Sequence, residues 1–289
     1  MSEVVPAALS ATTPRALLAE AAPALPSEEA RREAELLLMH ALGVDRAWLY
    51  AHGDDEVDTA ALATFRSLVT RRAAGEPLAY LTGRREFWSL DLALTPDVLI
   101  PRAETELLVE LALQRIPQSE KVDIADLGTG SGALALALAR ERPLAHVVAT
   151  DASAAALAVA RGNAQRLGIR NIEFVQGDWC AALGERKFDV IVSNPPYIAA
   201  SDRHLQQGDL RFEPTVALVS GPDGLDAIRI IARDARAHLQ PQGWLLLEHG
   251  YAQGAAVREI LGKSRFVEIF TARDLEGRDR VSGARAASP

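Results

Sequence analysis

The alternation of short apolar runs with helix-like runs, which begins near residue 121, constrains the fold of this chain more than any other feature. The apolar runs end in polar residues and cover 122–127, 145–151, 172–178 and 188–194. Helical periodicity follows the first two, over 133–141 and 153–167, and returns over 223–239. Strands that alternate with helices in this way are typical of a mostly parallel sheet. The sequence therefore predicts an α/β domain in the second part of the chain.

The first part of the chain predicts helices. Ser27 is a candidate N-cap for a helix that ends at Gly43, and Asp58 is a candidate N-cap for a second helix. The pattern changes to alternation over 84–100, which indicates a strand or a hairpin. We expect a helical domain over 1–82, a β-hairpin linker over 83–100 and an α/β domain over 101–289.

Composition limits the classes of function. The 289-residue chain has a net charge of −8 and a sequence pI near 5.4, which disfavours a protein held mainly by nucleic-acid phosphates. Its single cysteine, Cys180, excludes an intrachain disulfide, and no Cys/His cluster has metal-site spacing, so we expect no metal. The N-terminus lacks a signal-peptide pattern, and the apolar run 133–139 is too short to span a bilayer. We expect a cytoplasmic protein.

A glycine-rich loop lies between the first strand-like run and the helix that follows it. The loop consists of Gly128, Thr129, Gly130, Ser131 and Gly132. Glycine lets the backbone turn sharply and lets a ligand approach the main chain, although a plain tight turn is the alternative interpretation. The G-x-G-x-G spacing differs from the dinucleotide fingerprint, and Asp126 would repel a pyrophosphate. A zwitterionic, sulfonium-bearing cofactor suits this loop better.

Acidic residues end the next two strand-like runs. Asp151 can accept hydrogen bonds from both hydroxyls of a ribose, and Asp178 can accept one from the exocyclic amine of adenine. Trp179 can flank the adenine ring. The alternatives are an ordinary turn for Asp151 and simple packing for Trp179. After the glycine loop, this series favours a nucleoside site.

The run 188–194 ends abruptly in Asn194-Pro195-Pro196-Tyr197. A strand followed by a turn would explain Asn and Pro here, because both break strands. At the carboxyl edge of a parallel sheet, however, these residues lie where ligands bind. The Asn194 side-chain oxygen and the Pro195 carbonyl can accept both N–H groups of a planar amide, which orients its nitrogen. The prolines stiffen the loop, and Tyr197 can stack on the planar group.

The loop and the two strand-end acids resemble the S-adenosylmethionine-dependent methyltransferases. This resemblance implies a seven-stranded, Rossmann-like sheet whose last strand is antiparallel, here preceded by a small helical bundle. The fragments EPLAYLTGRREFW, LIPRAETE, DLGTGSGALALALA, VSNPPYI, RFEPTVAL and LLLEHGYAQG together resemble the bacterial release-factor glutamine methyltransferases over residues 27–281. That family implies methyl transfer from S-adenosylmethionine, with S-adenosylhomocysteine as product, to the glutamine side-chain nitrogen in the Gly-Gly-Gln motif of peptide chain release factors.

The same resemblance assigns roles to residues. It implies cofactor contacts from Gly128 to Gly132, Asp151, Trp179 and Asn194, and Asp178 joins them at the adenine. It implies that Asn194, Pro195, Pro196 and Tyr197 hold the glutamine, with Asn194, Pro195 and Tyr197 as the catalytic group. The helical domain would help to grip the release factor. We expect a monomer that uses neither a membrane nor a nucleic acid as partner.

One segment departs from the family pattern. Residues 101–106 read Pro-Arg-Ala-Glu-Thr-Glu where the family has Pro-Arg-Pro-Asp-Thr-Glu. We expect Thr105 and Glu106 still to border the cofactor pocket and assign no ligand role to Ala103 or Glu104. Alternatively, Glu104 and Glu106 only offset the helix dipole. His249, at the end of a later strand beside Glu248, is interpreted as structural.

Three rival functions remain for comparison. A nucleic-acid N-methyltransferase acting on adenine or guanine amino groups shares the Asn-Pro-Pro-Tyr motif, but the acidity of the chain disfavours it. A NAD-dependent oxidoreductase is disfavoured by the glycine spacing and by Asp126. A binding module with a degenerate cofactor site is disfavoured because every motif residue is present.

Overall fold

A computed structural model of the chain describes residues 11–287. By their contacts these residues form two compact units. The first comprises residues 11–84 together with Gln207–Phe212, and the second comprises Arg85–Gln206 and residues 213–287. Among the described residues, no helix is both long enough and apolar enough to cross a bilayer.

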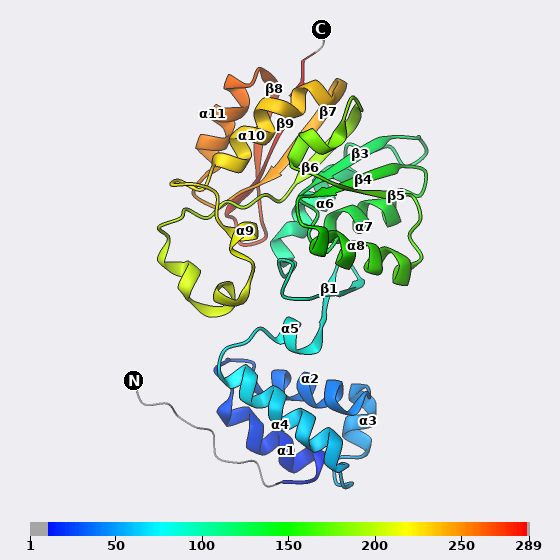
Figure 1. Cartoon of the computed structure of the whole chain (residues 1–289), viewed down its shortest axis with the longest axis vertical. Helices are drawn as coiled ribbons and strands as arrows, with labels where there is room; N and C mark the ends of the chain where they lie inside the picture. The colour runs from blue at the N-terminus through cyan, green and yellow to red at the C-terminus, as the bar shows by residue number, and fades with distance from the viewer. Residues whose placement is uncertain (1–10, 288–289) are drawn as a thin grey trace. The chain divides into compact units, whose positions relative to one another are not determined.

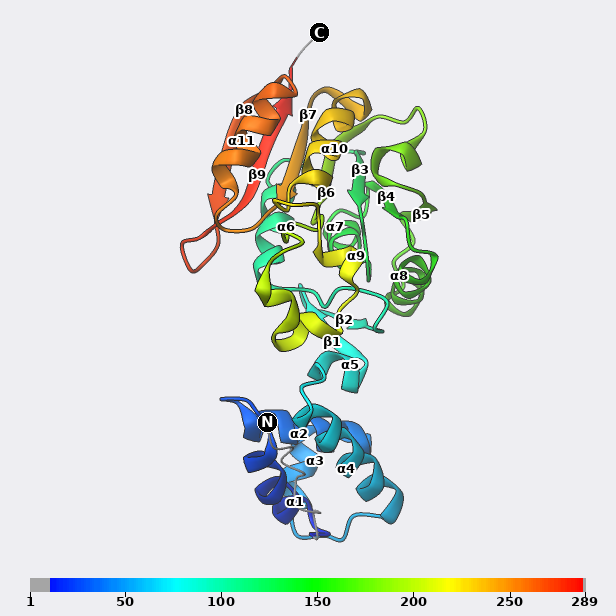
Figure 2. The same cartoon turned by 60° about the vertical axis from the view of Figure 1, so that its left-hand side comes forward.

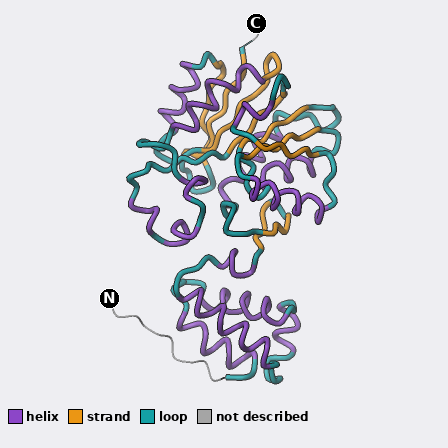
Figure 3. Tube along the Cα trace, viewed as in Figure 1, coloured by secondary structure: helices purple, strands orange, loops and turns teal. Residues whose placement is uncertain are grey.

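The first unit is helical, as Figure 3 shows for the N-terminal part of the chain. Its helices are α1 (Pro14–Ala21), α2 (Ala30–Leu42), α3 (Arg46–Ala51), α4 (Thr59–Ala73) and α5 (Leu78–Thr82). Its core is made of leucines around the fully buried Phe65. The Arg72 guanidinium on α4 forms a two-bond ion pair with Glu33 on α2, with N–O distances of 2.7 and 3.1 Å, and this pair joins the two longest helices of the unit.

The ends of these helices agree with the sequence patterns except at one point. Asp58 accepts hydrogen bonds from the backbone N–H groups of Ala60 and Ala61 and caps α4, and Gly43 ends α2 in the left-handed conformation. The prediction for Ser27 was wrong. α2 begins three residues later, at Ala30, and the Ser27 hydroxyl instead accepts from the Glu29 N–H at 3.1 Å. Ser27 thus stabilises the turn before the helix, as serine side chains often do.

A short hairpin opens the second unit. It consists of β1 (Arg84–Phe87) and β2 (Leu90–Ala93). Trp88 and Ser89 form the turn with φ of 51° and 55°, as a tight two-residue hairpin requires. Phe87, Leu90 and Leu92 are buried in the core of the second unit, so the hairpin packs there through its apolar face.

A seven-stranded sheet forms the centre of the second unit, and the predicted fold class is confirmed. The strands are β3 (Asp123–Leu127), β4 (His146–Asp151), β5 (Ile172–Gln176), β6 (Phe188–Ser193), β7 (Leu239–Glu248), β8 (Phe266–Arg273) and β9 (Asp279–Ala286). Their order is β5-β4-β3-β6-β7-β9-β8, and Figure 2 shows β8 and β9 at one end of the sheet and β5 at the other. The last strand, β9, is antiparallel to both of its neighbours, and the pairs among β3–β7 are parallel.

Helices cover both faces of this sheet (Figure 1). They are α6 (Glu106–Leu113), α7 (Ala133–Glu141), α8 (Ala154–Leu167), α10 (Asp226–Ala235) and α11 (Gly254–Lys263). On one face, α6 and α7 pack over Ile124, Val190 and Val192. On the other, α10 and α11 pack over Ile191 and Leu245. Val190, Ile191 and Val192 are consecutive in β6, so a run that is apolar throughout serves both cores, as expected of a buried parallel strand.

A buried asparagine on α8 joins the hairpin to the glycine loop. The Asn163 side chain on α8 exchanges two hydrogen bonds with the backbone of Ala93, at 2.7 and 3.0 Å. Its amide nitrogen also donates to the Ser131 carbonyl in the glycine loop at 3.0 Å. Asn163 therefore fixes the hairpin and the glycine loop to the same helix.

We expect Asn163→Ala to lower the free energy of unfolding by about 3 kcal/mol, because it leaves buried backbone groups without partners. Urea unfolding followed by circular dichroism measures this loss. Gln165→Ala, at an exposed position on the same helix, is the matched control and should change stability little. Equal stability of the two variants would contradict the role of Asn163.

Candidate functional site

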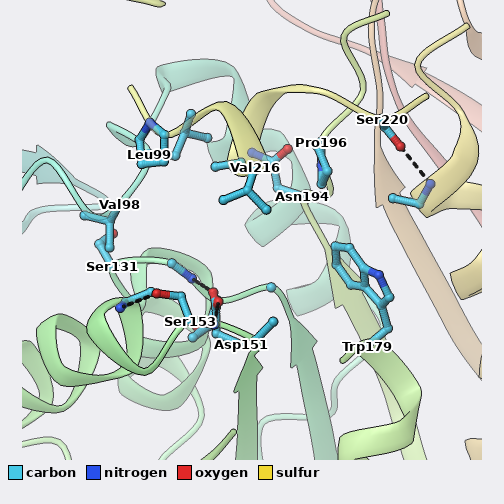
Figure 4. A pocket seen from close by; sticks show the side chains of 18 of the residues that line it. Val98, Leu99, Ser131, Asp151, Ser153, Trp179, Asn194, Pro196, Val216 and Ser220 are labelled. Atoms are coloured by element: carbon cyan, nitrogen blue, oxygen red, sulfur yellow. Dashed lines mark hydrogen bonds between the residues drawn. The ribbon is translucent and has the colours of Figure 1, made fainter. Parts of the chain in front are cut away.

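A pocket of about 450 Å³ opens in the second unit at the carboxyl ends of β3, β4 and β6. The chain runs from β3 outward through β4 to β5 and then returns to β6 on the other side of β3. Loops that leave the sheet at such a reversal diverge and leave a crevice between them, which is where open α/β sheets bind ligands. Figure 4 shows Ser131, Asp151, Trp179 and Asn194 around this space.

The glycine loop forms the base of the pocket. Gly128, Gly130 and Gly132 have φ of 75°, 55° and 87°, a region that residues with a side chain seldom occupy. A Cβ at Gly128 would come within 3.0 Å of the Trp179 ring, so the loop and this ring fit only without a side chain there. The N–H groups of Gly128 and Thr129 donate to the Thr150 carbonyl at 2.9 and 2.8 Å, which fixes the loop to the end of β4.

Asp151 holds the outer part of the loop. One carboxylate oxygen accepts from the Gly130 N–H at 2.9 Å, and the other accepts from the Ser153 N–H at 2.8 Å. The Ser153 hydroxyl in turn caps α8 by accepting from the Ala156 N–H at 3.1 Å. A carboxylate has about four acceptor positions, so Asp151 keeps free positions for hydroxyl groups of a ligand.

Asp126 lies fully buried beneath the loop. The Thr129 hydroxyl donates to its Oδ2 at 2.6 Å, whereas its Oδ1 has no hydrogen-bond partner among the described residues. Burial raises the pKa of Asp126 to about 7, the hydrogen bond from Thr129 opposes this rise, and the charge of Asp151 adds to it. A buried carboxyl of this kind favours a positive charge in the pocket above it.

Trp179 forms one wall. Its backbone has φ of 41°, a strained value for a residue with a bulky side chain, and it directly follows the exposed Asp178. Both residues line the pocket. The conformation turns the indole toward Gly128, where a planar ligand group can lie along it.

Asn194 and Pro196 form the opposite wall, at the end of β6. The Asn194 amide nitrogen donates to the Thr105 hydroxyl at 3.2 Å. Tyr197 is turned away and donates from its hydroxyl to Glu248 Oε1 at 3.3 Å, while its carbonyl accepts from Gln253 at 3.0 Å. Burial and the charge of Glu248 raise the pKa of Tyr197, so its hydroxyl keeps its proton.

The segment 213–221 adds a further wall that the sequence patterns did not indicate. It includes the short helix α9 (Thr215–Leu218), and Val216, Ala217 and Ser220 line the pocket. The side chain of Glu213, which is fully buried, pairs with Arg102 and accepts from the Ile100 N–H at 3.1 Å. In the sequence, the only sign of this wall is the fragment RFEPTVAL, in which Glu213 lies between two apolar residues. The sequence does not show that Glu213 pairs with Arg102.

The predicted site residues largely come together. Those that line the one pocket are Gly128, Thr129, Gly130, Ser131, Asp151, Asp178, Trp179, Asn194 and Pro196. Gly132 instead is the N-cap residue before α7, and Pro195 and Tyr197 do not line the pocket. Thr105 borders the pocket as expected, but Glu106 does not, because its carboxylate accepts from the Trp88 N–H at 2.9 Å. Glu106 thus fixes the hairpin turn. The sequence analysis expected Glu106 either to border the pocket or to offset the helix dipole, and neither interpretation included this role.

The charges around the pocket favour a cationic ligand. Its described lining contains Asp97, Asp151, Asp178 and Asp226 and neither lysine nor arginine. A pyrophosphate needs basic groups or free helix N–H donors, and here Asp126 also lies beneath the helix start. The pocket therefore opposes the dinucleotide alternative and suits a nucleoside that carries a positive charge.

Two family models match this chain, one in its N-terminal helical part and one in its α/β part. Residues 15–83 match the family model described as "PrmC N-terminal domain", and residues 103–210 match "Methyltransferase small domain". The release factor glutamine methyltransferase of Xylella fastidiosa (strain Temecula1) is 56% identical over 88% of this chain and 93% of its own length. The enzyme of the same name from Escherichia coli K12 is 48% identical over 90% of this chain and 93% of its own length.

Solved structures support the fold. The Thermus thermophilus 16S rRNA N2 G1207 methyltransferase, in complex with AdoMet and guanosine, aligns with a TM-score of 0.51 and 22% identity. The alignment covers 70% of this chain and 49% of that chain. At this level of identity, the likeness concerns the architecture of the sheet and its helices.

The buried acids predict how stability depends on pH. Burial also raises the pKa of Glu248 to about 7. Between the ordinary carboxyl pKa and about 7, the folded chain binds protons that the unfolded chain has released, so the unfolding free energy should fall as pH rises through this range. Asp126→Asn should make this slope shallower, whereas Asp55→Asn, at an exposed position, should leave it unchanged. Urea unfolding of the ligand-free protein between about pH 5 and pH 8 measures it, and an unchanged slope in Asp126→Asn would contradict the assignment.

Proposed function

The chain belongs to the release factor glutamine methyltransferase family, and from that premise we propose which of its residues carry out the reaction. It is a protein-glutamine N5-methyltransferase that uses S-adenosylmethionine. The observation that carries the proposed site is the position of Asn194 and Pro196 opposite the glycine loop across one acidic pocket. The relatives are named protein methyltransferases, so the nucleic-acid alternative has no support among them.

The pocket fits the cofactor. Bound S-adenosylmethionine supplies an activated methyl group on a positively charged sulfur. Asp151 would accept the ribose hydroxyls with the acceptor positions that Gly130 and Ser153 leave free. Trp179 and Asp178 would hold the adenine, and residues 128–132 would let the rest of the molecule approach the backbone. The buried Asp126 would favour the positive charge through space.

The Asn-Pro-Pro-Tyr segment would hold the glutamine. An amide nitrogen is a poor nucleophile because its lone pair is delocalised into the carbonyl. The Asn194 oxygen and the Pro195 carbonyl can accept its two N–H groups and so direct the nitrogen toward the methyl group. Pro195 and Pro196 reduce the entropy cost of keeping these acceptors in place. Tyr197 would fix the far end of the segment through its hydrogen bond to Glu248.

The partner is a peptide chain release factor, and the glutamine of its Gly-Gly-Gln motif is the proposed acceptor. Within this proposal, residues 1–82 form the recognition domain, 83–100 the hairpin linker and 101–289 the catalytic domain. The chain acts as a monomer without nucleic acid, in the cytoplasm, where release factors encounter ribosomes.

Mass spectrometry of a purified release factor, incubated with this protein and S-adenosylmethionine, tests the substrate directly. We expect a gain of one methyl group that maps to the Gly-Gly-Gln glutamine. A folded release factor that gains no methyl group would contradict the substrate, and labelled donor offered with DNA and ribosomal RNA would then test the rival activity.

Asn194→Ala tests the site. Removal of one positioned polar group costs about 100- to 1000-fold in kcat in comparable active sites, and we expect a loss of that size. Binding of S-adenosylmethionine, measured by calorimetry, should weaken much less, because most of the proposed cofactor contacts remain. Gln165→Ala is the surface control. Wild-type turnover in Asn194→Ala would disprove the proposed role.

A further inference from the structure

Two loops from later parts of the chain meet at the backbone carbonyl of Tyr197, the last residue of the Asn-Pro-Pro-Tyr segment. One loop is residues 221–225, with the sequence GPDGL, which lies before α10. The other is residues 249–253, with the sequence HGYAQ, which lies between β7 and α11. The sequence analysis gave neither loop a role in the reaction. The structure brings both to Tyr197 through the side chain of Gln253.

The Gln253 side chain binds three backbone groups. Its amide nitrogen donates to the Tyr197 carbonyl at 3.0 Å and to the Asp223 carbonyl at 3.2 Å. Its Oε1 accepts from the Gly250 N–H at 2.8 Å. Carbonyl oxygens only accept and an N–H only donates, so rotation of the carboxamide by half a turn would lose all three hydrogen bonds. We call these three hydrogen bonds the Gln253 clamp, and their polarity is fixed by the partners.

The clamp starts from a part of the backbone that is itself fixed. Gln253 is the N-cap residue of α11, its N–H donates to the Gly250 carbonyl at 2.8 Å, and its carbonyl accepts from the Val257 N–H at 2.9 Å. Val257 and Leu261 are fully buried and hold α11 against the sheet. The clamp thus ties the Tyr197 carbonyl to a helix that is anchored in the core.

Gly224 allows the first loop to approach the same carbonyl. Its φ is 78°, and a Cβ at this position would clash with the Tyr197 carbonyl oxygen and lie 2.8 Å from Gln253 Nε2. Only glycine fits between these groups in this conformation. The backbone of Tyr197 is therefore packed closely by one loop and hydrogen-bonded from the other.

We propose that Gln253 is a positioning residue for methyl transfer, because its hold on the Tyr197 carbonyl fixes the Asn194–Tyr197 segment with its acceptors directed at the substrate amide. This inference rests on the proposed function, in which the Asn194 oxygen and the Pro195 carbonyl hold the glutamine. Gln253 does not line the pocket, so its effect passes through the backbone of the segment.

The composition of the segment makes an anchor at its far end necessary. β6 ends at Ser193, whose hydroxyl donates to the Leu127 carbonyl at 2.7 Å and fixes the start of the segment. Pro195 and Pro196 have no N–H group that could hold them to a neighbour. Proline also fixes φ, so a displacement of Tyr197 displaces the Pro195 carbonyl with it. A shift of about 1 Å in a positioning group can cost about 100-fold in rate.

Tyr197 has a second anchor, which limits the expected loss. Its hydroxyl donates to Glu248 Oε1 at 3.3 Å and holds the end of the side chain, whereas Gln253 holds the main chain. Without the clamp the segment is loosened and not released. The loss in turnover should therefore be smaller than the loss expected for Asn194→Ala.

Two variants of Gln253 test the clamp in the full-length protein at about pH 8, with release factor as substrate and saturating S-adenosylmethionine. Gln253→Leu removes all three hydrogen bonds at similar size. Gln253→Glu keeps the shape and the acceptor for Gly250, but its carboxylate, ionised at this pH, faces the Tyr197 carbonyl with an oxygen. Each should lower kcat by about tenfold, the loss expected for one hydrogen bond, and Gln253→Glu at least as much as Gln253→Leu. Glu259→Gln, at an exposed ion pair on α11, is the matched control and should keep wild-type kcat.

The comparison of kcat with the binding constants separates positioning from a general structural role. The clamp touches neither the glycine loop nor Asp151, so the affinity for S-adenosylmethionine, measured by calorimetry, should change little. The KM for release factor should also change little, because the lost interaction acts on the reacting geometry. A raised KM with unchanged kcat, an equal loss of cofactor affinity, or wild-type kcat in both variants would overturn the inference. If circular dichroism shows that Gln253→Leu does not fold, Gln253→Glu decides the question by itself.

The Asn194→Ala variant keeps this inference distinct from the proposed function. Loss of turnover in Asn194→Ala with normal kcat in both Gln253 variants would overturn the clamp alone. Normal turnover in Asn194→Ala would overturn the proposed function as well.

Discussion

The parallel pairing of β3 with β6 is the constraint on which the rest of the site depends. In this register Ile124 lies beside Val190 and Asp126 beside Val192, so the glycine loop and Asn194 leave the sheet at the same level. The Ser193 hydroxyl strengthens this match by donating to the Leu127 carbonyl at 2.7 Å. Because the chain departs from β3 in one direction and returns to β6 from the other, the two loops diverge and leave the pocket between them.

Each side of the pocket is supported from behind by a buried acid. Asp126 lies under the glycine loop and Glu248 behind the Asn-Pro-Pro-Tyr segment, and each has one oxygen without a hydrogen-bond partner among the described residues. Such groups reduce stability, so their presence fits a site that is organised before its ligands arrive. The first accepts a hydrogen bond from Thr129 in the glycine loop, and the second accepts one from Tyr197 in the segment proposed to hold the glutamine.

The excursion between β6 and α10 connects the site with the rest of the chain. Its two ends are joined by a bridge between Ile198 and Val219, and its returning half supplies Val216 to the pocket. Its middle, Gln207–Phe212, belongs by its contacts to the helical unit, where Arg211 donates to the Ala74 carbonyl at 2.9 Å. The segment that follows the proposed glutamine-binding residues thus also completes the unit that we assign to partner recognition.

The sequence by itself determined the α/β class, the helix ends at Gly43 and Asp58 and the residues of the glycine loop, because strand–helix alternation, caps and glycines act locally. It also indicated Asp151, Trp179 and Asn194, which end successive strands and therefore meet at one sheet edge. Only the tertiary structure decided that Glu213 pairs with Arg102, that Glu106 holds the Trp88 turn, and that Glu248 accepts from Tyr197. These contacts join residues far apart in the chain, and a buried acid shows its role only when the fold reveals which donors surround it.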